Sequence, residues 1–461
     1  MSQSQTQRSS RVDLLHGSIL KSLLLFALPI MASRVFQQIY NTMDTLIVGH
    51  TLGDSSIAAM GACSSIYEMM TGFTFGVGNG LAIVTARCFG RQETERMKKS
   101  VASCIVIGIT VTLVVTVLAT IFMHPLLRLL KTPAEILEES YSYISILSVF
   151  LFVMFAYNLC SGLLGAIGNS FMPLVFLIIS SLVNIVLDLL FIRSFGMGVR
   201  GAAIATVISQ TLSAAFVLYF LKKRSELNVR FLTRSELSRC TETAKNIVSL
   251  GTAGFIMQLT NSLVSICCNN VLSVTGGDIY ISVMTIISSV RQLVETPIYA
   301  MNEGSSPILS YNYGARRPKR VKQAIGTMAA MIFAYTAIMW SVIIVAPHFL
   351  IGIFSSDSEL IKDAVPALKL YFAAFIFMDL QYIGQTTFKS LNKKKQAIFF
   401  SLLRKVFIVV PLTYLLPYAL GMGTRGVFMA EPVSNVIGGS LCFLTMLATV
   451  IPELNHMEKQ K

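Results

Sequence analysis

The chain has 461 residues, of which 54% are hydrophobic and only 13% are charged, and its formal net charge is +14. Because soluble domains contain about 25% charged residues, this composition excludes an ordinary cytosolic protein, and the high hydrophobicity equally excludes a disordered chain. The net charge alone would suit a nucleic-acid-binding protein, but the basic residues lie where a membrane protein places them, so we expect no nucleic-acid partner.

Apolar runs along the chain predict membrane-spanning helices, since about 20 apolar residues cross a bilayer. The start of the chain is polar, and the apolar run that follows is too long for the core of a signal peptide. In chain order the twelve predicted spans are residues 23–49, 56–86, 101–123, 141–166, 174–193, 200–221, 247–273, 280–311, 324–350, 365–388, 397–420 and 426–450. The lipid bilayer is therefore the expected environment of an all-α polytopic protein.

Basic residues set the expected orientation. If the N-terminus is inside, most of the 37 Lys and Arg residues fall in inner loops, and only Arg34 and Arg291 are counted within spans. An even number of spans returns the chain to the side on which it began. We therefore expect a multi-pass protein of the cell inner (plasma) membrane with both termini in the cytoplasm.

The second half of the chain repeats the first at an offset of about 224 residues. Gly53 corresponds to Gly277, and the hexapeptide at 196–201 resembles the one at 421–426. Six spans in each half predict two six-helix lobes related by a pseudo-twofold axis along the membrane normal, the design of a transporter whose cavity opens to alternate sides. The expected domains are a cytoplasmic tail (1–22), an N-lobe (23–221), a cytoplasmic linker (222–246), a C-lobe (247–450) and a second cytoplasmic tail (451–461).

Polar side chains inside the predicted spans are candidates for function, because ionisable groups there cost a few kcal/mol to insert. In the first half these residues are Gln37, Asn41, Asp44, Asn158, Asn184, Asp188 and Thr206. Gln37, Asn41 and Asp44 form one polar stripe on the first span, and Asn184 and Asp188 lie one turn apart on the fifth. Pro29, fifteen residues before Asp44, is expected to kink the first span.

Asp44 and Asp188 invite three interpretations. If they face the same interior, each disfavours ionisation of the other, and at least one is expected to bind a proton near neutral pH. Alternatively, two carboxylates together with amide and hydroxyl oxygens can coordinate a monovalent cation. The third interpretation is structural, with these side chains serving only as polar contacts between helices.

The second half does not repeat this pair, since Asp44 corresponds to Cys268 and Asp188 to Thr413. Its own acids within or near the spans are Glu295, Glu303, Asp379 and Glu431. Asp379 has Tyr382 on its face, and Glu295 follows Arg291 by one turn, which predicts an intrahelical ion pair. Glu303 and Glu431 are expected near membrane edges. Because the spans hold more acids than bases, we expect an anionic cavity that attracts organic cations.

The sequence shows no arrangement of residues typical of an enzyme or a cofactor site. The glycines at 72–80 lie in an apolar run with no Lys-Ser/Thr after them, so they indicate close helix packing rather than a phosphate loop. The five His and eight Cys residues show no metal-binding spacing. We expect no enzymatic activity, no cofactor and no bound metal apart from a coupling ion, H⁺ or Na⁺.

The chain resembles the MATE family, the multidrug and toxic compound extrusion transporters, and is most similar to its bacterial multidrug exporters. The resemblance is carried by QQIYNTMDTLIVG at 37–49, by the glycines and arginine at 80–90, and by EGSSPILSYNYG at 303–314. It covers essentially the whole chain.

By this resemblance the family's coupling-cation site falls on Asp44, Asn158, Asn184, Asp188 and Thr206, and Pro29 matches a proline whose helix bends in some members. Asp379 matches an acid that another branch uses in the C-lobe, but that branch's acid in the seventh span is replaced here by Gln258. The candidates for the substrate cavity are Gln37, Asn41, Gln258, Glu295, Asp379 and Tyr382.

We expect a monomeric secondary antiporter that exports amphipathic, cationic drugs or metabolites in exchange for H⁺ or Na⁺ by alternating access. The alternative is a flippase for lipid-linked saccharide precursors, which has the same overall architecture. Such precursors are anionic and need several basic residues in the cavity, whereas only Arg34 and Arg291 are counted within spans.

Overall fold

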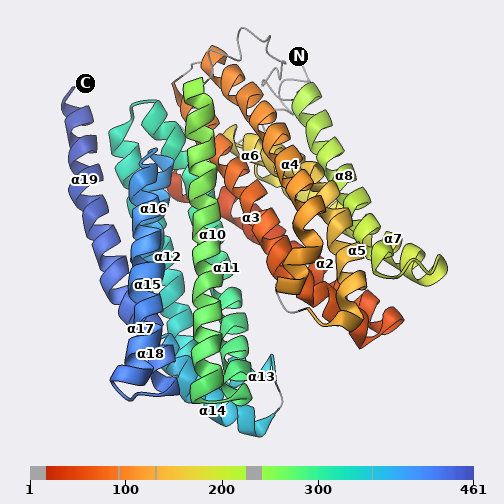
Figure 1. Ribbon diagram of the computed structural model, residues 1–461. Helices are drawn as coiled ribbons and strands as arrows, with labels where there is room; N and C mark the ends of the chain where they lie inside the picture. The colour runs from red at the N-terminus through yellow and green to blue at the C-terminus, as the bar shows by residue number, and fades with distance from the viewer. Residues whose placement is uncertain (1–16, 92–93, 130–131, 225–240, 356, 461) are drawn as a thin grey trace. The chain divides into compact units, whose positions relative to one another are not determined.

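Helices form the fold throughout the part of the chain that the computed structural model describes, which is residues 17–91, 94–129, 132–224, 241–355 and 357–460 (Figure 1). For some helical residues in these ranges only the backbone is described, and no strand occurs in them. The first half contains α2 (Ile19–Leu52), α3 (Asp54–Gly90), α4 (Thr94–Leu129), α5 (Ala134–Val149), α6 (Leu151–Ala166), α7 (Phe171–Asp188), the π-helix η1 (Leu189–Ser194) and α8 (Gly198–Arg224).

The second half contains more broken helices. They are α10 (Thr241–Thr275), α11 (Asp278–Gly314), α12 (Pro318–Val345), α13 (Pro347–Gly352), α14 (Ser358–Tyr371), α15 (Phe375–Ser390), α16 (Lys394–Leu402), η2 (Leu403–Val409), α17 (Val410–Tyr414), η3 (Leu415–Ala419), α18 (Thr424–Ser434), η4 (Asn435–Gly439) and α19 (Ser440–Lys459). Most of the predicted linker lies outside the described residues.

Every predicted span falls on helical residues, with short breaks in some of them. Within the described ranges, six helices are by themselves long and apolar enough to cross a membrane, and a seventh span results if α5 and α6, bent by 48° at their junction, are counted together. The remaining predicted spans fall on α3, α4, α10, α11 and the pair α14–α15. The prediction of an all-helical membrane protein is thus confirmed.

The chain divides into two compact units. Of the described residues, the first unit takes 28–224 and 241–255, and the second takes 17–27 and 256–460. The helix α2 belongs to both, because its residues up to Ala27 pack in the second unit. Gly304 of α11 permits this packing, since a Cβ there would lie 3.0 Å from the backbone nitrogen of Ala27. The division falls just before Pro29, which lies inside the continuous helix α2.

The predicted repeat is visible in the backbone of each unit. Gly53 precedes α3 with φ 95° and ψ −178°, and Gly277 precedes α11 with φ 72° and ψ −168°. The first two of the three glycines in each matched hexapeptide also have positive φ, at 196, 198, 421 and 423. These are conformations that glycine adopts at little cost. The π-helices η1 and η3 occupy corresponding positions just before the two hexapeptides.

Close packing of α3 against α6 shapes the first unit. A Cβ on Gly162 would lie 2.7 Å from the carbonyl oxygen of Gly78, and one on Gly78 would lie 2.9 Å from that of Asn158. The prediction that glycines in 72–80 serve helix packing is confirmed at Gly78. The contact brings the Nδ2 of Asn158 to within 3.2 Å of the hydroxyl of Thr74, to which it donates a hydrogen bond.

Candidate ion and substrate sites

Two buried aspartates meet in the first unit. Asp44 of α2 is 6% exposed and Asp188, the last residue of α7, is 0% exposed. Their carboxyl groups lie within hydrogen-bonding reach of each other. No described residue donates a hydrogen bond to either oxygen of Asp188 or to Oδ1 of Asp44. Two buried carboxyls so placed repel each other if both are charged, so this arrangement is suited to holding a proton or a small cation.

The end of α7 explains how Asp188 reaches this position. The helix changes to the π-helix η1 directly after Asp188, and such wider turns occur often at functional sites. Asn184, one turn before Asp188, is fully buried. Neither its amide oxygen nor its amide nitrogen has a partner among the described residues. Its oxygen is therefore free to serve as a ligand.

Thr206 joins this group through a tyrosine that the sequence prediction missed. The hydroxyl of Tyr40 donates a hydrogen bond of 3.0 Å to Oγ1 of Thr206, and its ring lies near both aspartates. Tyr40 precedes Asp44 by one turn of α2, which is the signal that would have identified it. Asn158 contacts Thr74 instead, and no described contact joins it to the acids.

The other predicted residues of the first unit lie apart from the acid pair. Gln37 and Asn41 are exposed, and no described contact joins them to Asp44. Pro29 lies within α2, where its carbonyl accepts a hydrogen bond of 2.8 Å from the hydroxyl of Ser33. In the second unit, the side chain of Gln258 lies outside the described residues.

The predicted ion pair in the second unit is confirmed. The Nε of Arg291 lies 2.5 Å from Oε1 of Glu295 on the same helix, α11. The hydroxyl of Tyr382 on α15 donates a hydrogen bond of 3.2 Å to the other oxygen of Glu295. The Nη1 of Arg291 also donates to the hydroxyl of Tyr371 on α14, over 2.6 Å. Glu295 and Tyr382 are thus brought together.

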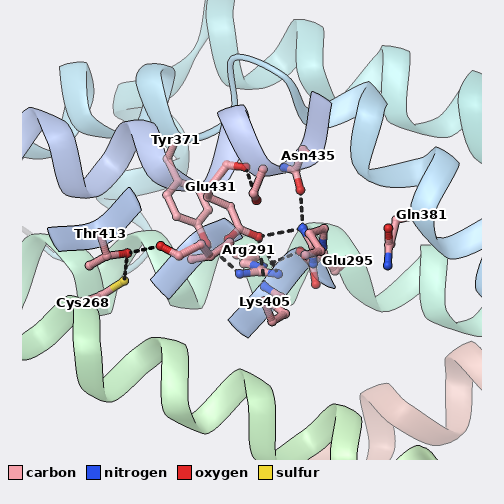
Figure 2. A network of polar contacts seen from close by, with 12 residues as sticks. Cys268, Arg291, Glu295, Tyr371, Gln381, Lys405, Thr413, Glu431 and Asn435 are labelled. Atoms are coloured by element: carbon pink, nitrogen blue, oxygen red, sulfur yellow. Dashed lines mark hydrogen bonds and ion pairs between the residues drawn. The ribbon is translucent and has the colours of Figure 1, made fainter. Parts of the chain in front are cut away.

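Glu431 lies at the centre of a larger network in the same unit (Figure 2). Its Oε1 is 3.1 Å from Nη1 of Arg404, 3.1 Å from Nζ of Lys405 and 3.4 Å from Nη2 of Arg291. The side chain of Glu431 is buried inside the second unit. Three cations around one carboxylate oxygen offset the cost of burying that charge.

The count of basic residues within spans is wrong. Arg404 and Lys405 lie in η2, inside the apolar helix Lys394–Ala419, and each is only 4% exposed. Both residues lie inside the predicted span 397–420, so the count of two basic residues within spans had overlooked them. Their ion pairs with Glu431 allow them to be buried within the span.

Three further residues of the second unit bear on the sequence predictions, namely Cys268, Thr413 and Asp379. The residues that correspond to the acid pair also meet, since Sγ of Cys268 lies 3.9 Å from Oγ1 of Thr413 (Figure 2). Asp379 on α15 is fully buried, with Thr336 beside it, and neither of its oxygens has a hydrogen bond of ordinary geometry from a described residue. The described residues contain no group of three or more His, Cys, Asp or Glu side chains that could hold a metal ion.

Comparisons with known proteins place the fold and the repeat in a wider context. The MatE family model matches the chain twice, over residues 29–190 and 254–415, an offset of 225 residues. The chain is 24% identical over 437 residues to the probable multidrug resistance protein YoeA of Bacillus subtilis, covering 94% of this chain and 93% of the relative. It is 23% identical over 436 residues to the multidrug export protein MepA of Staphylococcus aureus, again covering 94% and 93%. A solved MATE structure in the bent conformation matches with a TM-score of 0.89 and 22% identity, over 97% of this chain and 98% of that one.

Proposed function

The chain belongs to the MATE family of multidrug efflux transporters, and from that premise we propose that it is a secondary antiporter that exports amphipathic small molecules in exchange for H⁺ or Na⁺. The observation that carries the proposal is the buried pair Asp44–Asp188, whose carboxyls meet without a hydrogen-bond donor from the described residues. As a member of this family the protein is a multi-pass membrane transporter and not an enzyme.

In the proposed mechanism the acid pair takes up the coupling ion. Asp44, Asp188 and Asn184 supply the oxygens, and Thr206 is positioned by Tyr40. Ion and substrate drive each other only if they stabilise different conformations, because a ligand shifts an equilibrium only by its differential affinity for the two states. An ion entering along its gradient therefore weakens the hold on the substrate, and the release of the ion restores it.

Organic cations are the first substrates to test. The buried charged residues described in the first unit are Asp44 and Asp188, both acids. The second unit is different, since Arg404 and Lys405 are buried there. The sequence argument against a flippase for lipid-linked precursors was that the spans contain too few basic residues, and this argument therefore does not hold. The multidrug exporters among the relatives are what make the flippase the less favoured alternative.

The proposed setting is the cell inner (plasma) membrane, with both termini in the cytoplasm and the transporter acting as a monomer. The basic loops support this orientation. We propose no cofactor other than the coupling ion.

Uptake into inside-out vesicles tests the proposal. A fluorescent organic cation is offered under an imposed pH gradient and, separately, under an imposed Na⁺ gradient. We expect accumulation under one of the two gradients, which identifies the coupling ion. An absence of uptake under both gradients, with folded protein present, would contradict the proposal.

The variants Asp44→Asn and Asp188→Asn extend this test. Both keep the size of the side chain and remove the carboxylate, so we expect folded protein that has lost gradient-driven uptake. Glu138→Gln is the matched control, because Glu138 is an exposed acid that contacts only His124 in the described structure. Uptake by the two aspartate variants equal to that of the control would refute the role of the acid pair.

A further inference from the structure

The charged network of the second unit contains one more basic than acidic side chain. Its three bases, Arg291, Arg404 and Lys405, surround two acids, Glu295 and Glu431. The other buried carboxyl of this unit, on Asp379, forms no described ion pair with them. A net charge buried in a membrane span is costly unless a counter-charge is bound. The network therefore has room, electrostatically, for one further negative charge.

Two π-helices hold the bases in place. Arg404 and Lys405 are neighbours in η2, where the wider turn reduces the angle between adjacent side chains and lets both reach the same oxygen of Glu431. The Nη1 of Arg404 also donates a hydrogen bond to Oδ1 of Asn435, the first residue of η4. Gly438 of η4 leaves space for the stem of Arg404, since a Cβ there would lie 2.8 Å from its Cγ.

Several residues of this cluster correspond, through the repeat, to residues that lie around the acid pair in the first unit. At the offset of the repeat, Arg291 corresponds to Tyr67, Glu431 to Thr206 and Asn435 to Gln210. In the first unit Tyr67 lies near both Gln210 and Asp44. Neither η2 nor η4 has a π-helical counterpart there, because the matching residues lie in α7 and α8. The same place in the repeat is therefore acidic in one unit and basic in the other.

The bases retain donors for a ligand. Arg404 uses only Nη1 in its contacts with described residues, so the edge formed by Nε and Nη2 is unpartnered. Two parallel N–H groups of this kind fit the two oxygens of a carboxylate. Among the described residues Lys405 donates only to Glu431, which leaves two of its three N–H groups without a described partner. Arg291 lies at the border of the cluster, with 20% of its side-chain surface exposed.

We propose that Arg404, Lys405 and Arg291 form a binding site for the carboxylate of an exported amphiphile, so that the substrates of this transporter include acidic and zwitterionic molecules. A single carboxylate brings the cluster to neutrality, whereas a phosphate monoester, with a charge of about −1.5 to −2, would overcompensate it. The inference rests on the proposed function, because it names a substrate class for the same transporter.

Binding of three matched probes to the purified protein in lipid nanodiscs tests the inference. The probes are dansyl-6-aminohexanoate, its neutral primary amide and dansylcadaverine, which share a fluorophore and a similar linker but carry charges of −1, 0 and +1. We expect the carboxylate to bind roughly tenfold or more tightly than the amide, as for a hydrogen-bonded charged group. Equal affinities for carboxylate and amide would overturn the proposal.

Charge-balanced variants separate the site from a structural ion-pair network. Lys405→Gln makes the cluster neutral while Glu431 keeps both arginines, so we expect the preference for the carboxylate to be lost. Lys405→Gln/Glu431→Gln restores the single positive charge and should regain most of the preference, as should Lys405→Arg. Gel filtration and thermal unfolding confirm that each variant is folded. A preference that persists in Lys405→Gln, or that stays absent in both other variants, would refute the site.

The same assay distinguishes failure of this inference from failure of the antiport proposal. Binding needs no ion gradient, so Asp188→Asn, expected to abolish driven transport, should still prefer the carboxylate. Loss of the preference in Asp188→Asn would show that the two units do not act as separate sites, and would count against the inference.

Discussion

At the scale of single residues, the two units bury charge in opposite ways. Asp44 and Asp188 meet without a donor from the described residues, whereas Glu431 meets three cations. The first arrangement is suited to exchanging an ion. The second is held together by its own contacts, because removing one partner of a buried ion pair leaves an uncompensated charge.

Glu431 is accordingly expected to be the most sensitive residue of its network. Glu431→Gln leaves Arg291, Arg404 and Lys405 without their shared anion, and we expect the free energy of unfolding to fall by roughly 3–5 kcal/mol. Thermal unfolding in detergent measures the change. Lys405→Gln/Glu431→Gln should lose clearly less than the single variant. Equal losses would mean that the charges do not interact as described.

The residues that the sequence could and could not identify differ for a physical reason. An acid inside an apolar run is conspicuous because burying it costs energy, and so Asp44, Asp188 and the Arg291–Glu295 pair were found. Tyr40 was missed because tyrosine is common in membrane helices, and only its place one turn before Asp44 marks it. Arg404 and Lys405 were overlooked although they lie inside the predicted span 397–420, and the sequence did not reveal their ion pairs with Glu431, which is distant in sequence.

At the scale of helices, the spans were predictable from apolar runs, but their interruptions were not. The π-helices η2 and η4 lie within runs that look continuous in sequence. Neighbouring elements approach η4 closely at Gly438 and Gly439. The hydrophobic periodicity of a sequence does not reveal such contacts between segments, so it did not predict the π-helices.

Gly439 shows how tight this packing is. A Cβ on Gly439 would meet the backbone carbonyl oxygen of Phe377, which cannot move aside as a flexible side chain would. We expect Gly439→Ala to lower the free energy of unfolding by roughly 1–3 kcal/mol. The control is Gly326→Ala in α12, where nothing lies within 4 Å of the added carbon. A loss no larger than that of the control would show that η4 is not packed against α15 in this way.

At the scale of the whole molecule, duplication explains both the likeness and the difference of the halves. The family model matches each half once, and corresponding glycines keep the same backbone conformation. The residues at the polar centre have nevertheless diverged, from Asp44 and Asp188 to Cys268 and Thr413. We infer that the ion-coupling chemistry belongs to the first unit and that the second is specialised for other contacts.

The repeat also leads to a prediction about orientation. Six predicted spans in each half would return the chain to its starting side, and the basic loops predict that this side is the cytoplasm. A fluorescent protein fused to the C-terminus should therefore fluoresce in the cell, and alkaline phosphatase fused there should be inactive. Active phosphatase at the C-terminus would contradict an even number of spans with both ends inside.

The coupling of an ion to the acid pair is the central claim, and the movement of that ion tests it most directly. Inside-out vesicles are energised with a proton gradient, or loaded to form a Na⁺ gradient, and an ion-sensitive dye follows the gradient when an organic cation is added. We predict that the substrate dissipates one of the two gradients with wild-type protein and neither with Asp188→Asn. Substrate accumulation that leaves both gradients unchanged, or an unaltered response in Asp188→Asn, would contradict it.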